Sequence, residues 1–167
     1  MSKVDNIILI RGPLADYLKF DVEKYLETFG EDVANTKELR NVVVSYSDYP
    51  KTDKPLATEI DKEERKWLLK EIDFAIDKIN KDEYTRQAII YNLHDSGLEH
   101  NCLNVLHLFF RKNKLDMNVY VRSMNFDANF DNDMHTFNLI LEKASKETHK
   151  PKGQTNVFIM SLHRFKR

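Results

Sequence analysis

The residues of this chain best suited to chemistry are its single cysteine and an arginine followed by a serine. Cys102 is the only thiol among 167 residues, so it is either a small buried residue or a nucleophile. Arg122 and Ser123 close an apolar stretch, and a guanidinium next to a hydroxyl offers several hydrogen-bond donors to an anion. This pattern favours a ligand-binding role for Arg122 over a simple surface ion pair.

Two further polar residues are candidates for a binding site. Asp133 comes just before an apolar helical pattern, so it can cap a helix, bind a ligand or do both. His163 ends an apolar stretch and can be a ligand-binding or a half-buried structural histidine. The other five of the six histidines share no metal-ligand spacing with carboxylates, and the sequence therefore predicts no metal site.

The elements that must position these residues are a mixture of strands and helices. Apolar patterns predict helices over 14–29, 61–80 and 133–148, the first ended by Gly30 and the second opened by a capping box of Asp61 and Glu64. Strands are predicted at 7–10, 41–46, 87–91, 103–111, 115–123 and 157–163. A hairpin turn is predicted at 112–114 and an exposed loop at 47–60. The order predicts one α+β domain over 1–167, with a mixed or antiparallel sheet and flanking helices.

The composition excludes several classes of protein. Hydrophobic residues make up 41% of the chain and only four glycines and four prolines are present, which excludes a disordered or fibrous chain. A net charge of -1 disfavours binding to nucleic acid. The apolar run at 7–10 is too short for a signal peptide or a membrane span. With a single unpaired thiol, these features predict a cytoplasmic protein without membrane partners.

Four motifs in the second half stand in an order that matches a known family. They are DEYTRQA at 82–88, the isolated Cys102, RSMN at 122–125 with Asp133 following, and SLHRF at 161–165. In this order, over about residues 69–165, the chain resembles the thymidylate synthase and deoxycytidylate hydroxymethylase superfamily, especially its short phage-type members. The resemblance implies a thymidylate synthase-like α+β fold.

The resemblance also implies a reaction, which is C5 methylation or hydroxymethylation of a pyrimidine nucleoside monophosphate. Cys102 would add to C6 of the base, and 5,10-methylenetetrahydrofolate would supply the one-carbon unit. A set of polar side chains would bind the nucleotide and lower the pKa of the thiol: Arg86, Arg122, Ser123, Asn125, Asp133 and His163. The family further implies a homodimer in which Arg86 reaches the partner's site, and the host cytoplasm as the location if the chain is phage-encoded.

Asp133 bears on which base is bound. The family has Asn at this position for uracil and Asp in its cytosine-specific members. An ionised carboxylate accepts hydrogen bonds only, and the N4 amino group of cytosine is a donor. The resemblance therefore favours a cytosine nucleotide, while the sugar and the final choice of base stay open.

Several positions depart from the family pattern. Asn125 replaces an aspartate, and Phe165 replaces a tyrosine whose hydroxyl contacts the sugar. Glu23 and Arg11 are the spacing-compatible candidates for the family's catalytic glutamate and its N-terminal phosphate arginine. Family enzymes continue past the position of Arg167 into a tail that covers the folate, so an incomplete folate site is expected. Two alternatives remain: a nucleotide-binding homologue with reduced catalysis, or a regulatory subunit of a full-length member.

Overall fold

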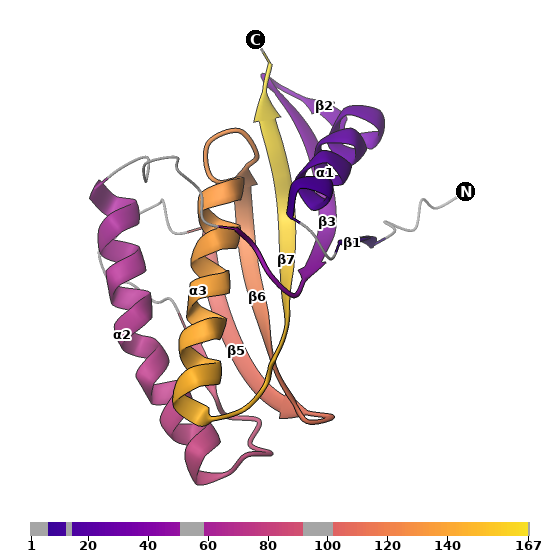
Figure 1. Cartoon of the computed structure of the whole chain (residues 1–167). Coiled ribbons are helices and arrows are strands. Elements are labelled where there is room, and N and C mark those ends of the chain that lie inside the picture. The colour runs from indigo at the N-terminus through magenta and orange to yellow at the C-terminus, as the bar shows by residue number, and fades with distance from the viewer. Residues whose placement is uncertain (1–6, 13–14, 51–58, 92–101, 167) are drawn as a thin grey trace.

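A computed structural model describes residues 7–12, 15–50, 59–91 and 102–166 of the chain. The elements follow in the order β1 (Ile8–Arg11), α1 (Ala15–Phe29), β2 (Glu31–Val33), β3 (Thr36–Tyr46), α2 (Glu59–Lys81), β4 (Ile89–Tyr91), β5 (Leu103–Arg111), β6 (Lys114–Asn125), α3 (Phe130–Thr148) and β7 (Lys152–Phe165). Mixed strands and helices of this kind confirm the α+β class (Figure 1).

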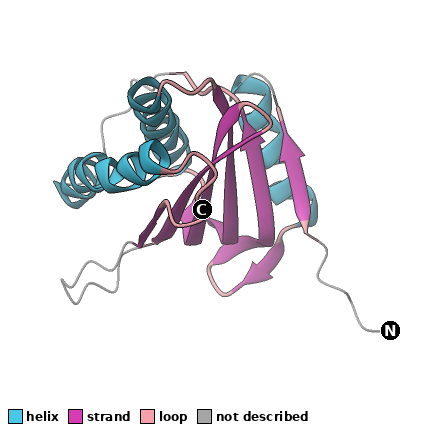
Figure 2. Ribbon diagram, turned by 90° about the horizontal axis from the view of Figure 1, so that it is seen from below, coloured by secondary structure: helices cyan, strands magenta, loops and turns pink. Residues whose placement is uncertain are grey.

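The seven strands of the described residues join one mixed sheet. Its order is β1-β3-β7-β6-β5-β4, and β2 pairs with β3 beside this path. β1 runs parallel to β3 and β6 parallel to β7, whereas the other neighbouring strands are antiparallel. The three helices lie on one face of the sheet (Figure 2). The other face, which we call the open face, is covered by no helix among the described residues.

The core lies between the sheet and the helices. One row of fully or almost fully buried side chains crosses four neighbouring strands in register: Val44, Val157, Val119 and Leu106. α1 contributes Leu18, Val22 and Leu26, which recur at helical spacing and are fully buried. Burial of each such side chain contributes roughly 1.5–3 kcal/mol. This apolar contact fixes the helices on one face and leaves the strand ends to carry polar groups.

Three neighbouring strands change their inward face at the same level. In β6 the buried residues are odd-numbered up to Val121 and then continue at Met124. In β7 the same change occurs between Ile159 and Leu162, which lie in register with those two residues. In β3 it occurs at Asn41, whose φ of 57° is the left-handed backbone typical of a bulge. Beyond this line of kinks, alternation places Ser123, Asn125, Ser161 and His163 on the open face.

The structure corrects some predicted boundaries. β3 begins at Thr36 instead of 41, and β2 was not predicted. α2 begins at Glu59, so the capping box of Asp61 and Glu64 is wrong, because both residues lie within the helix. The hairpin turn is confirmed at Lys112 and Asn113, whose φ values of 50° and 59° suit a two-residue turn. Of the predicted loop 47–60, residues 51–58 lie outside the described part of the chain.

The start of α3 also differs from the prediction. The helix begins at Phe130, and Asn129 occupies the N-cap position. Asp133 is therefore not an N-cap; it lies in the first turn, and its backbone N–H donates to the carbonyl oxygen of Asn129 at 2.9 Å. Among the described helices, none has a stretch long and apolar enough to cross a membrane.

Candidate functional site

Five of the predicted site residues meet at one end of the sheet. β5 begins, and β6 and β7 end, at the same edge, because β5 is antiparallel to β6 and β6 is parallel to β7. This edge holds Cys102, Arg122, Ser123, Asn125 and His163, and we call it the site edge. The backbone N–H of Arg122 donates to the carbonyl oxygen of Cys102 at 2.7 Å. Ser123 Oγ lies 3.3 Å from His163 Nδ1.

The exposure of these side chains suits a binding site. Cys102 is half-buried and packs against the hydrophobic core. Arg122 is exposed, whereas Ser123 and His163 are half-buried. A cation that solvent reaches, beside partly enclosed hydroxyl and imidazole groups, can bind an anionic ligand without a buried unpaired charge.

Asn125 has a structural task in addition to its predicted role. Its Oδ1 accepts hydrogen bonds from the backbone N–H groups of Asp127 at 3.1 Å and Ala128 at 3.2 Å. The next residue, Phe126, donates its backbone N–H to the carbonyl oxygen of His163 at 2.8 Å. Because an amide oxygen has two lone pairs, Asn125 can offer a ligand only its Nδ2 donor. The side chain therefore shapes the turn that leads into α3.

Asp133 is half-buried in the first turn of α3. The partial positive charge of a helix N-terminus favours an ionised carboxylate here. Tyr46 lies close by, and its hydroxyl donates to the carbonyl oxygen of Met134 at 2.8 Å. Burial raises the pKa of Tyr46 well above its ordinary value, and the nearby Tyr49 and Asp133 add to this shift. Asp133 thus lies in the first turn of the helix that follows the site edge, on the side of the sheet that the helices cover.

The structure does not bring Arg86 to the site edge of its own chain. Arg86 is exposed in the segment between α2 and β4, where Ala88 accepts a hydrogen bond from Leu108 at 2.9 Å. Cys102 precedes Leu108 by six residues along an extended strand, which corresponds to about 20 Å. Within one copy, Arg86 and Cys102 therefore lie near opposite ends of β5.

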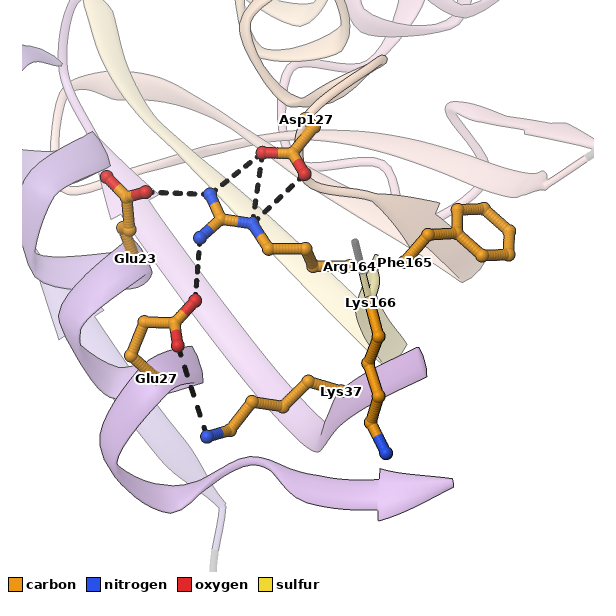
Figure 3. A pocket seen from close by; sticks show the side chains of 7 residues that line it. All are labelled: Glu23, Glu27, Lys37, Asp127, Arg164, Phe165 and Lys166. Atoms are coloured by element: carbon orange, nitrogen blue, oxygen red, sulfur yellow. Dashed lines mark hydrogen bonds and ion pairs between the residues drawn. The ribbon is translucent and has the colours of Figure 1, made fainter. Parts of the chain in front are cut away.

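Next to the site edge lies a cavity of about 600 Å³ that the sequence did not predict. It is lined by Glu23, Glu27, Lys37, Asp127, Arg164, Phe165 and Lys166 (Figure 3). Glu23, the candidate catalytic glutamate, is ion-paired here with Arg164 at 2.7 Å. The ring of Phe165 meets that of His163 edge to face, with centroids 5.6 Å apart. The one signal of this cavity in the sequence was Arg164, a charged residue between His163 and Phe165 at the end of an apolar strand.

Arg11, the candidate phosphate arginine, lies away from this edge. It lines a smaller cavity of about 260 Å³ with Ser45 and Gln154, near the start of β7. Since β7 runs from there to His163, the two cavities lie near opposite ends of the sheet. Within the described ranges, no group of three His, Cys, Asp or Glu side chains is arranged to hold a metal ion.

Comparisons with known proteins bear on the fold. No protein-family model and no curated protein sequence matches this chain significantly. Among solved structures, it is similar to thymidylate synthase A from Bacillus subtilis, with a TM-score of 0.51 and 15% identity, and to thymidylate synthase from T4 phage, with a TM-score of 0.52 and 18% identity. The chain has a thymidylate synthase-like fold.

The similarity covers part of each protein. It spans 57% of this chain in both comparisons, and 36% and 35% of the two synthases. The chain thus spans about a third of the length of these thymidylate synthases. This likeness confirms the fold expected from the motifs at 82–88, 102, 122–125 and 161–165.

Proposed function

We propose that this thymidylate synthase-like chain binds a pyrimidine nucleoside monophosphate at the site edge. The observation that carries the proposal is the convergence of Cys102, Arg122 and the Ser123–His163 pair at one edge of this fold. Arg122 and Ser123 bind the phosphate, because a guanidinium and a hydroxyl together supply several charge-assisted or neutral donors. His163 donates to a sugar hydroxyl, and Asp133 accepts from the base.

The proposed reaction begins at the sulfur of Cys102. Its thiolate forms a bond to C6 of the pyrimidine, and the electrons of the C5–C6 double bond move to C5 and the C4 substituent. C5 then becomes a nucleophile that can take a proton or attack a one-carbon electrophile. Loss of the hydrogen originally on C5, followed by expulsion of the thiolate, restores the double bond. The positive charge of Arg122 favours the thiolate over the thiol.

We also propose that two copies of the chain combine through the open face. An apolar row crosses six strands there in register: Leu9, Val43, Phe158, Tyr120, Val105 and Tyr91. Tyr120 and Phe158 stack at 4.8 Å, yet Tyr120 remains 38% exposed and Tyr91 57% exposed. Apolar rows of this extent are typical of interaction surfaces.

The expected symmetry of such a homodimer supports a role for Arg86. A twofold axis in the plane of the interface and perpendicular to the strands superimposes opposite ends of the two sheets. The end of β5 near Arg86 in one copy would then face the end near Cys102 in the other. Arg86 would thereby contribute a second cation to the partner's site, which it cannot do within its own chain.

The cavity beside the site edge fits the donor 5,10-methylenetetrahydrofolate poorly. A pterin ring needs an apolar or aromatic slot with a few polar groups. The cavity beside the site edge instead carries six charged side chains, and Phe165 is its one aromatic residue. We therefore assign no step to a folate, although the one-carbon reaction of the proposal calls for a donor of this class.

The reaction can be tested without a donor. In deuterated water, thiolate addition and reversal exchange the C5 hydrogen of deoxycytidine or deoxyuridine monophosphate for deuterium, and loss of the proton signal reports it. Wild-type protein should catalyse the exchange, and Cys102→Ser should not. Binding without exchange in the wild type would contradict the catalytic proposal.

A second candidate function is nucleotide binding without turnover. The observations that favour it are the use of Asn125 Oδ1 inside its own turn and the missing hydroxyl at Phe165. The same experiment distinguishes the two functions. If the protein only binds the nucleotide, the bound nucleotide would protect Cys102 from alkylation, and the hydrogen on C5 of its base would not exchange.

A further inference from the structure

Arg164 is surrounded by three carboxylates from two separate parts of the chain. Its Nε lies 3.0 Å from both carboxylate oxygens of Asp127, in the turn after β6. Its Nη1 donates to Glu27 at 2.6 Å and its Nη2 to Glu23 at 2.7 Å, both on α1. Figure 3 shows these three carboxylates around the guanidinium. The guanidinium also lies over the ring of Phe126, 4.9 Å from the centroid.

This side chain does not share a face of the sheet with Ser123, Asn125 and His163. Side chains alternate along a strand, so His163 and Phe165 share one face of β7 and Arg164 points to the other. Its contacts with Glu23 and Glu27 place it on the side of α1. Arg164 therefore acts on a ligand only through the residues that it holds.

What Arg164 holds is the turn that joins the site edge to α3. The backbone of Phe126 already binds the carbonyl oxygen of His163 at 2.8 Å. The two bonds from Arg164 to Asp127 add a second connection between the same turn and the same end of β7. Asp127 also donates its backbone N–H to Asn125 at 3.1 Å. The ion pair thus adds to the contacts that connect Asn125 with the end of β7 near His163.

An arginine is needed for this arrangement. Its planar fork reaches three carboxylates in fixed directions, which a lysine cannot do with a single nitrogen. Partial burial works against the charge of Arg164, but the bonds to Glu23, Asp127 and Glu27 outweigh it and raise the pKa of the guanidinium. An arginine guanidinium keeps its charge over the pH range in which proteins fold.

We infer that Arg164 is a positioning residue, which fixes the turn of residues 126–129 through Asp127 and so sets Asn125 and His163 for the ligand. The inference rests on the proposed function for its ligand. It assigns different tasks to the carboxylates: Asp127 connects Arg164 to the site, and Glu27 connects it to α1.

Two matched variants test this division. Asp127→Asn and Glu27→Gln each replace one carboxylate of the same guanidinium by an amide of similar shape, at side chains that are 47% and 50% exposed. We expect Asp127→Asn to weaken binding of deoxycytidine monophosphate about tenfold, because bonds to a charged group are lost from the turn. Glu27→Gln should change this affinity by less than about twofold, because an exposed ion pair away from the turn contributes little.

Two measurements without ligand complete the test. Asp127→Asn should speed hydrogen exchange at the Phe126 amide and shift the imidazole resonances of His163, whereas Glu27→Gln should do neither. Equal effects of the two variants on affinity, exchange and resonances would reduce Arg164 to a general structural contact and overturn the inference. If the wild type binds neither monophosphate, the proposed function fails, and the exchange and resonance data alone decide the role of Arg164.

Discussion

Ser123 Oγ lies 3.3 Å from His163 Nδ1 across two neighbouring parallel strands, just beyond the level where both strands change their inward face. The contact exists because the kinks turn both side chains to the open face. Without the kinks, each side chain would point into the core. In the tautomer in which Nδ1 accepts the serine proton, Nε2 carries a hydrogen and can donate to a sugar hydroxyl. The pair therefore fixes the direction of the imidazole.

Replacement of Arg122 by Ala should weaken nucleotide binding selectively. The lost charge-assisted bonds to the phosphate correspond to about 1.5–3 kcal/mol, or roughly 10- to 150-fold in affinity. Calorimetry with deoxycytidine monophosphate and with deoxycytidine checks this, with Lys112→Ala in the distant hairpin turn as a control. An equal loss of affinity for nucleotide and nucleoside would contradict a phosphate role.

Cys102 should react with iodoacetamide in the folded protein at neutral pH. The residue is half-buried, and in the proposed site the cation of Arg122 on the neighbouring strand favours the reactive thiolate. Bound deoxycytidine monophosphate should slow the labelling, which mass spectrometry of the intact protein can follow. Labelling that occurs only after denaturation would make Cys102 a structural residue.

Asp133→Asn should alter the preference between the two bases. In the proposed site the carboxylate accepts from the cytosine amino group, so the substitution should narrow or reverse a preference for cytidylate by roughly 1–3 kcal/mol. Because Asn129 occupies the N-cap position, capping does not mask the result, and the stability cost of the lost charge near the helix N-terminus should be about 0.3–1 kcal/mol. Competition between the two monophosphates measures the ratio, and an unchanged ratio removes Asp133 from the base site.

Tyr120→Lys should convert the proposed homodimer to a monomer. Tyr120 lies in the middle of the apolar row, and a lysine there would bury an unpaired charge in the interface. Sedimentation velocity of wild type and variant checks the assembly state. Phe74→Lys is the matched control, since Phe74 is also exposed, at 54%, but lies on α2. A monomeric wild type would refute this surface as a dimer interface.

His107 should make the folded state less stable in mild acid. Burial, together with the nearby Arg111, lowers the pKa of His107 below its ordinary value of 6.5, and its Nε2 is buried without a hydrogen-bond partner among the described residues. The unfolded chain therefore binds the proton more readily. The contribution of neutral His107 to the free energy of unfolding is complete above about pH 6.5. It is lost as the pH falls through the lower pKa of the folded state.

A comparison of wild type with His107→Gln isolates this effect. Urea denaturation at pH 7.5 and pH 5.5 should show a smaller loss of the free energy of unfolding in the variant, because glutamine does not titrate. Equal losses in both proteins would show that other groups cause the acid sensitivity.

The sequence predicted most elements because their patterns are local. The turn at Lys112 and Asn113 follows in part from Asn113, a residue type that tolerates a positive φ, and the period of α1 follows from Leu18, Val22 and Leu26. The line of kinks could not be predicted. In the sequence, a break in the alternation of core-facing residues looks the same as the end of a strand. The cluster around Arg164 could not be predicted either, because it joins residues 137 and 141 positions apart.

Because Arg86 and Cys102 lie near opposite ends of β5, the fraction of proposed sites that hold ligand depends on the protein concentration. A site that uses both residues exists only where two chains meet, so ligand binding and self-association are linked by mass action. Ligand would then favour assembly, and the apparent affinity for ligand would fall as the protein is diluted below its dissociation constant. The total amount of protein in a cell would become a control on its own activity, with no separate regulatory site.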